Sequence, residues 1–228
     1  MRHIFVFFVC ISLLAGCRFL RISDFHRQAP VSQPLPHLGL QVHVESFALL
    51  FGKELAERIL VSNAIDPGSY IPPPVGILAQ VGQPVHDVFL LLGNELNENF
   101  VQATGDQRGK ARFKLIYYNR FNSGWGYTIP SVLTFGVVNI FGLPAKVTRS
   151  EMELQMEIVD NAGNVLAHYR APGAGKAKVA MYYGYSGFGA MRKANLLALQ
   201  DAMQGIKQQM EADLPELHTQ LTADQPTR

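Results

Sequence analysis

A regular alternation of apolar and polar residues on both sides of a turn motif restricts this chain to folds that contain a β-hairpin. In residues 151–158 every second position is apolar, and the positions between them are Glu or Gln. The sequence Asp160-Asn161-Ala162-Gly163, typical of hairpin turns, follows, and the alternation resumes at Val165, Ala167 and Tyr169. Because side chains along a strand point alternately to the two faces of a sheet, this pattern predicts two antiparallel strands with one buried face.

Two further segments show the same alternation. Apolar residues stand at every second position of residues 40–44, and residues 110–117 alternate apolar side chains with Lys110, Arg112 and Lys114. The outer face of residues 110–117 is basic and that of residues 151–158 is acidic, so neighbouring strands would attract by a few tenths of a kcal/mol per exposed pair. We therefore expect these two strands to be adjacent.

Apolar residues recur at intervals of three and four in two longer segments, which predicts amphipathic helices over residues 84–102 and 190–213. Their apolar stripes consist of Val85, Val88, Phe89, Leu92, Leu96 and Phe100, and of Leu196, Leu199, Met203, Ile206, Met210 and Leu214. Asp87, Glu95 and Glu98 fall outside the first stripe, so we expect these carboxylates to be solvated.

The order of these segments indicates an α+β fold, in which a mostly antiparallel sheet of about four strands has two main helices packed on one face. A length of 228 residues suits one domain, which we place at residues 39–214. Residues 17–38 contain Pro30, Pro34 and Pro36 and are expected to form an extended tether. Residues 215–228 are expected to be a flexible C-terminal tail.

The beginning of the chain has the three parts of a secretory signal peptide. Met1-Arg2-His3 is a short positive start, residues 4–14 form an apolar run interrupted only by Ser12, and Leu14-Ala15-Gly16-Cys17 ends the run with small residues. The apolar run is too short to cross a bilayer of about 30 Å, which requires about 20 residues. The segment is therefore typical of a sequence that directs export and is then removed.

This N-terminus resembles the signal of bacterial lipoproteins, whose lipobox reads Leu, a small residue, Gly or Ala, then Cys, as residues 14–17 do. The resemblance implies that residues 1–16 are removed as a signal peptide and that Cys17 receives a lipid. It also implies the periplasmic face of the outer membrane, because Asp after the cysteine favours the inner membrane and Arg18 stands here. An ordinary signal peptide cut elsewhere and an uncleaved anchor are the alternatives.

Composition limits the partners and the source of stability. The chain has 2 cysteines, of which Cys10 would leave with the signal peptide and Cys17 would carry the lipid. The mature chain would then have no disulfide and would depend on its hydrophobic core. Lys and Arg total 20 and Asp and Glu total 18, a balance that gives no bulk attraction to nucleic acid, so no nucleic-acid partner is expected.

Motifs for catalysis and metal binding are incomplete. Gly184-Tyr185-Ser186-Gly187-Phe188 has Phe188 where a nucleophile elbow requires glycine, and Ser186 is better suited to cap the last helix. Gly175-Lys176 resembles the end of a phosphate loop but lacks its first glycine and the Ser or Thr that binds magnesium. The histidines are scattered without the spacing of a metal site. We therefore assign no catalytic residue, metal or cofactor and expect no enzyme activity.

A long uncharged segment is the first candidate for a binding surface. From Phe121 to Ala145 the chain has no Asp, Glu, Lys, Arg or His. The aromatic residues Trp125, Tyr127, Phe135 and Phe141 lie in it. Prolines and glycines interrupt the segment, and its longest proline-free part is too short to cross a bilayer as a helix. It is either a connection packed under the sheet and helices or an apolar surface for a partner or a membrane.

The segment around the start of the last helix is the second candidate. Arg192 and Lys193 are expected in the first turn of that helix and Glu211 and Asp213 in its last turn, an unfavourable order for the helix dipole. The glycine-rich residues before the helix also include Lys176, Lys178, Tyr183 and Tyr185. Free amides, basic groups and aromatic rings suit an anionic or glycan-like ligand. The alternative is that these residues form an ordinary strand and turn with solvated charges.

These features favour a non-catalytic envelope lipoprotein, anchored to the membrane through Cys17, that binds another envelope protein or a glycan and supports envelope assembly or maintenance. The order of elements is similar to that of uncharacterised outer-membrane accessory lipoproteins, although no motif beyond residues 14–17 carries the similarity. A lipid-binding or membrane-active carrier module is the first alternative, and a periplasmic hydrolase is the second.

The lipid anchor yields a direct prediction. Cys17→Ser should abolish labelling of the protein by a radioactive or clickable fatty acid and should release or mislocalise the protein, since one cysteine carries the anchor. The folded domain should be unaffected, as judged by circular dichroism. Fatty-acid label retained on Cys17→Ser would refute the assignment.

Overall fold

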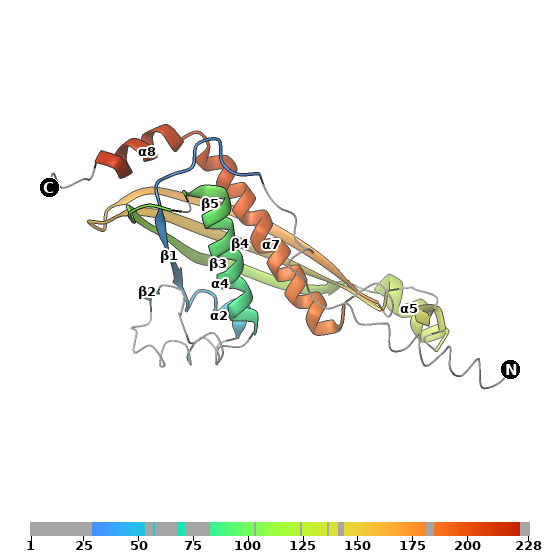
Figure 1. Cartoon of the computed structure of the whole chain (residues 1–228). Helices are drawn as coiled ribbons and strands as arrows, with labels where there is room; N and C mark the ends of the chain where they lie inside the picture. The colour runs from blue at the N-terminus through green and yellow to red at the C-terminus, as the bar shows by residue number, and fades with distance from the viewer. Residues whose placement is uncertain are drawn as a thin grey trace.

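The computed structural model describes residues 29–52, 57, 68–71, 83–102, 104–123, 125–135, 137–140, 144–180 and 185–223. Their strands form one five-stranded sheet in the order β2-β1-β3-β4-β5 (Figure 1). The strands are β1 (Leu38–His43), β2 (Tyr70–Ile71), β3 (Gly109–Ser123), β4 (Lys146–Asp160) and β5 (Val165–Val179). Strands β1 and β3 are parallel, and the other neighbours are antiparallel.

Strands β3, β4 and β5 form the main part of the sheet, each with 15 residues. The expected hairpin joins β4 to β5: Asn164 donates from its backbone and side chain to the Asp160 carboxylate, and Gly163 adopts a positive φ of 96°. The predicted neighbours β3 and β4 are paired, with Arg112 opposite Glu157. The Arg112 guanidinium nevertheless donates to Gln41 on β1, so charge complementarity does not lead to an ion pair at that position.

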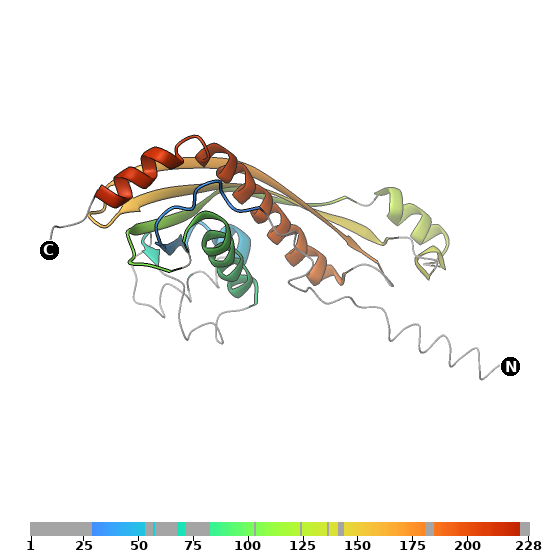
Figure 2. The ribbon, with the colours of Figure 1, turned by 45° about the horizontal axis from the view of Figure 1, so that its top comes forward.

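The described helices are α2 (Ala48–Phe51), α4 (Gln83–Glu95), the π-helix η2 (Leu96–Phe100), α5 (Trp125–Leu133), α6 (Val137–Ile140), α7 (Gly187–Met210) and α8 (Leu214–Ala223). Helices α4 and α7 lie side by side on one face of the sheet, and α7 runs obliquely across β4 and β5 (Figures 1 and 2). These are the two main helices expected from the apolar stripes, which continue through η2 in the first case.

The mixed α/β fold with a mostly antiparallel sheet is confirmed, and the strand count is corrected from about four to five. Strand β2 has only 2 residues, too few to leave an alternation in the sequence. The parallel pairing of β1 and β3 was also not expected. It follows from the crossover through α4, because parallel neighbours need a long connection whereas a tight hairpin gives antiparallel ones.

Helix α7 approaches β5 unusually closely because small residues face one another. Every second residue of β5 from Ala171 to Ala177 is alanine or glycine and is buried. A Cβ atom at Gly173 would lie 2.0 Å from the carbonyl oxygen of Ala198, and one at Gly175 would lie 1.9 Å from that of Ala194. The glycines of β5 therefore serve backbone-to-backbone packing, whereas the sequence analysis assigned this glycine-rich segment to a candidate site for an anion or glycan.

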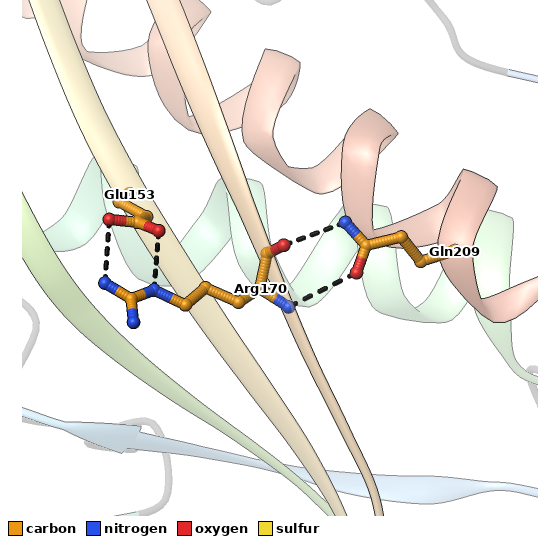
Figure 3. A network of polar contacts seen from close by, with 3 residues as sticks. All are labelled: Glu153, Arg170 and Gln209. Atoms are coloured by element: carbon orange, nitrogen blue, oxygen red, sulfur yellow. Dashed lines mark hydrogen bonds and ion pairs between the residues drawn. The ribbon is translucent and has the colours of Figure 1, made fainter.

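Side chains of α7 also cover the free edge of β5. Gln209 donates to the Arg170 carbonyl oxygen at 2.8 Å and accepts from the Arg170 N–H, while the Arg170 side chain pairs with Glu153 on β4 (Figure 3). Asp201 accepts from the Ala174 N–H at 2.9 Å. Pro172, which lies between Arg170 and Ala174 on β5, has no N–H to be covered. An uncovered edge strand invites pairing with another chain, so this arrangement protects the edge.

The folded unit extends beyond the expected boundaries of 39–214 at both ends. Val31 and Leu35, expected in the tether, are buried in the core, and their N–H groups donate to carbonyl oxygens of Asn99 and Phe100. Residues 214–223, mostly expected in the flexible tail, form α8, whose Leu217 and Leu221 are buried. The spacing of Leu214, Leu217 and Leu221 gives this helix an apolar face that packs on the core.

The close approach of α7 to β5 yields a stability prediction. Gly175→Ala places a methyl group against the backbone of α7 and should destabilise the fold by about 1–3 kcal/mol, the usual cost of overpacking. Ala174→Val, one residue away on the exposed face, should change stability by less than about 0.5 kcal/mol. Urea unfolding monitored by circular dichroism gives both values. Equal stability of Gly175→Ala and wild type would contradict the packing argument.

Candidate functional site

The connection between β3 and β4 forms a separate helical tip. It contains α5 and α6 and lies at the end of the long strands, away from α4 and α8 (Figures 1 and 2). Thr134 donates from its N–H and its hydroxyl to the Pro130 carbonyl oxygen, which closes α5. Phe135 then adopts a positive φ of 51°, and the Val137 N–H donates to the Thr134 carbonyl oxygen. These bonds define a turn from α5 into α6, and we call residues 125–140 the apolar tip.

The apolar tip presents aliphatic and aromatic side chains to solvent. Ile129, Val132 and Leu133 follow the i, i+3, i+4 spacing of one helix face, and the exposed fractions of Val132 and Leu133 are 68% and 74%. Phe135 is 98% exposed, and Val137 is also exposed. A surface helix of a globular protein normally turns such a stripe toward the core. Contiguous exposed apolar residues are typical of a contact surface for a partner or a membrane.

Three of the four residues predicted for an apolar interface lie in this tip. Trp125 and Tyr127 belong to α5 and Phe135 to the turn, whereas Phe141 lies outside the described residues. Exposure of Phe135 favours the surface alternative over a packed connection. Sequence reasoning missed the aliphatic residues Ile129, Val132, Leu133 and Val137. Their helical spacing was visible, but spacing alone does not tell whether a stripe faces the core or the solvent.

The residues predicted for an anion or glycan site do not form one cluster. Arg192 donates from Nε to the Asp87 carboxylate on α4 at 2.7 Å and forms an ion pair with it, and its guanidinium lies 5.8 Å from the centre of the Phe188 ring. Lys193 donates to the Tyr185 hydroxyl at 2.6 Å. Lys176 and Lys178 alternate with buried Ala177 and are exposed on the face of the sheet opposite α7. Tyr183 lies outside the described residues.

The charge order expected for the helix over residues 190–213, which is α7 in the structure, is also revised. Helix α7 begins at Gly187, where Ser186 caps it by accepting the Gly189 N–H at 3.1 Å. Arg192 and Lys193 therefore lie beyond the first turn, and the last turn contains Lys207, which suits the helix dipole. The predicted role of Ser186 as a cap is confirmed.

The two acidic residues expected in the last turn of α7 lie just after the helix. The Glu211 carboxylate accepts from the backbone and hydroxyl of Ser32, and the Asp213 carboxylate accepts from the Tyr169 hydroxyl at 2.8 Å. Both acids thus connect α7 to neighbouring elements. The helix ends themselves no longer provide a reason to invoke an anionic ligand.

Two carboxylates expected to be solvated are instead engaged with α7. Asp87 is paired with Arg192, and Glu95 is buried, where it accepts from Asn99 at 2.5 Å and from Gln200 at 3.0 Å. Burial raises the pKa of Glu95 above its ordinary value, although the hydrogen bonds from Gln200 and Asn99 act in the opposite direction. The ion pair of Asp87 with Arg192 and the hydrogen bond from Gln200 to Glu95 cross between α4 and α7, which explains why polar residues lie between two otherwise apolar helix faces.

Other kinds of site receive no support from the described parts of the chain. Within those ranges no group of three or more His, Cys, Asp or Glu residues could hold a metal ion. Of the helices described, none is both long enough and apolar enough to cross a membrane. The apolar tip is therefore the surface from which a function can be argued.

Comparisons with known proteins provide a distant structural neighbour. No family model and no curated protein matches this chain. A solved structure described as that of a candidate lipoprotein from Caulobacter crescentus CB15 is 12% identical, covers 63% of this chain and 86% of its own, and has a TM-score of 0.32. That likeness is too remote to carry an argument about function, which has to come from the geometry.

The buried carboxylate of Glu95 yields a pH prediction. Its raised pKa means that its contribution to stability is fully present below the pKa of the unfolded chain and is lost as pH rises through the folded pKa. Glu95→Gln does not titrate, so its stability relative to wild type should increase from pH ~4.5 to pH ~8. Urea unfolding across this range measures the difference.

Glu151→Gln, at an exposed position on β4, serves as the matched control and should track wild type at every pH. A constant loss of stability for Glu95→Gln, independent of pH, would show that the variant reports altered hydrogen bonding and not the titration of a buried carboxylate.

Proposed function

We propose that the chain is a non-catalytic, lipid-anchored accessory module of the bacterial cell envelope, which makes a second contact with an envelope component through its apolar tip. The observation that carries this proposal is the exposed stripe of Ile129, Val132 and Leu133, together with Phe135. Full burial of an aliphatic or aromatic side chain stabilises by about 1.5–3 kcal/mol, so a contact that covers these residues would be substantial.

The lipobox-like sequence that ends at Cys17 supports attachment to a membrane, and Arg18 supports the periplasmic face of the outer membrane. The number of residues between the anchor and the body limits how far the body can lie from the lipid. The first described residue that is buried is Val31, so 13 residues, 18 to 30, separate it from the lipid site. In an extended form they would span roughly 40 Å, which lets the body select its own orientation.

The position of the tip supports a role in contact and not in folding. Strands β3 and β4 carry it beyond the main helices (Figure 2), and Ile129, Val132, Leu133 and Phe135 of the tip are exposed. Apolar side chains that the fold leaves exposed are free to serve a partner.

Photo-crosslinking in intact cells tests the proposal. A photoreactive residue replaces Val132 in the lipidated protein, and the matched control replaces Gln208, an exposed residue near the other end of α7. We expect a discrete adduct with an envelope component from position 132 and none from position 208. Comparable adducts from both positions, or none from position 132, would exclude the tip as the contact surface.

Charged substitutions in the tip give a companion prediction. Val132→Asp with Phe135→Asp should leave stability within about 1 kcal/mol of wild type, because both positions are exposed. The same pair should abolish the contact, since burial of a carboxylate in an apolar interface is costly. Thermal unfolding and crosslinking from Val137 measure the two effects. Unfolding of this variant would assign the residues to the core instead.

A further inference from the structure

Acidic residues are missing from the parts of the chain that build the tip end of the sheet. No Asp or Glu occurs between residues 107 and 150 or between residues 161 and 200. Within these two segments the basic residues closest to the tip are Lys146, Arg149, Lys176 and Lys178, all on β4 or β5. The tip end of the molecule therefore combines an uncharged apolar extremity with exclusively basic residues at its base.

Strand register places Arg149, Lys176 and Lys178 on one face of the sheet, whereas Lys146 lies on the other face, beside Gly187 at the start of α7. Lys146 is the first residue of β4 after the tip, and Lys178 pairs with Val147. Arg149 lies directly opposite Lys176, and both are exposed on the face of the sheet that points away from α7. Like charges directly opposite each other on neighbouring strands are unfavourable. The nearest acidic residue on β4, Glu151, lies two pairs further from the tip than Arg149, opposite Ala174. We call Lys146, Arg149, Lys176 and Lys178 the basic collar.

We propose that the apolar tip and the basic collar together bind the surface of an anionic phospholipid bilayer, the tip entering the headgroup region and the collar meeting the phosphates. This inference deepens the proposed function and rests on it, because it names the occupant of the contact surface. The lipid on Cys17 and the tip then form two separate attachments of one molecule.

The apolar tip has the properties that insertion at a membrane interface requires. Apolar faces of interfacial helices lie about 5–10 Å deep, at the boundary of headgroups and acyl chains. The segment from Phe121 to Ala145 contains no charged residue that would have to be desolvated. Ile129, Val132, Leu133 and Phe135 provide the side chains that would enter.

The basic collar makes the bilayer a better candidate than a protein partner. Each Lys or Arg close to an anionic lipid surface increases affinity about fivefold. Phosphates between Arg149 and Lys176 would also relieve the repulsion between them. A protein partner would have to supply an acidic rim around an apolar pocket. An anionic bilayer already has negatively charged headgroups at its surface, where the collar would lie, and acyl chains beneath them, where the tip would enter.

Vesicle binding by the full mature chain from residue 17, with Cys17→Ser to remove the lipid, tests the inference. The probes are vesicles of phosphatidylglycerol mixed with phosphatidylcholine and vesicles of phosphatidylcholine alone, compared by flotation at low and high salt. Trp125 is the chain's only tryptophan and lies in α5, so quenching of its emission by brominated lipids reports contact of the tip with the acyl chains. We expect binding and quenching with the anionic vesicles, both weakened by salt.

Matched charge variants distinguish a local contribution of the basic collar to vesicle binding from an effect of the overall net charge. Arg149→Gln with Lys176→Gln should weaken binding to anionic vesicles by about tenfold to thirtyfold. The control, Lys110→Gln with Lys114→Gln, removes the same charge from the same face at the other end of the sheet and should change affinity by less than about twofold. If the first pair unfolds the protein in a thermal melt, Lys176→Gln with Lys178→Gln replaces it. Val132→Asp with Phe135→Asp should eliminate quenching.

Three results would overturn the inference: equal binding to both kinds of vesicle, equal effects of the collar and control variants, or unquenched Trp125 emission in the bound state. Absence of vesicle binding together with a protein adduct from position 132 in cells would show that the bilayer is the wrong occupant while the proposed function stands. Absence of both would reject both.

Discussion

The contact between β5 and α7 is the constraint on which the rest of the architecture depends. Glycine and alanine at alternate positions of β5 let the helix backbone approach the strand backbone, and a single additional methyl group at Gly173 or Gly175 would collide with it. Such close packing fixes the path of α7 across the sheet over its 24 residues. Side chains of α7 can then reach the edge of β5, where Gln209 and Asp201 form hydrogen bonds with backbone groups that no neighbouring strand pairs with.

Once α7 is fixed, it positions α4 and the N-terminal segment. The ion pair of Arg192 with Asp87 and the hydrogen bond from Gln200 to Glu95 join the two helices. A buried carboxylate without a paired cation is costly, and the raised pKa of Glu95 reflects that cost. Beyond the end of α7, Glu211 accepts from Ser32 at the point where the chain enters the core. The body is thus organised around one helix, while β3 and β4 extend from it and carry the apolar tip.

The division between body and tip gives the functional argument its physical basis. Most described apolar residues of the body are buried in two core clusters, whereas Ile129, Val132, Leu133, Phe135 and Val137 of the tip are exposed. Stability alone does not explain an exposed stripe of aliphatic side chains next to a basic collar, because folding gains nothing from either. Both features acquire a purpose when the tip meets an anionic, layered surface. The lipid proposed on Cys17 would then limit where the molecule is found, and the tip would determine how the body is oriented there.

The sequence alone determined those features that depend on local periodicity and short motifs. Alternation identified four of the five strands, the three-and-four spacing identified the two main helices, turn chemistry placed the hairpin at Asp160–Asn164, and Ser186 was recognised as a cap. The tertiary structure decided what depends on distant neighbours. It gave the glycines of β5 a packing role, buried Glu95, paired Arg192 with Asp87 and added the parallel strand pair. It also turned Val132 and Phe135 toward solvent. Periodicity shows that a stripe or a charge is present, but only the arrangement of other elements around it decides whether it is buried, paired or exposed.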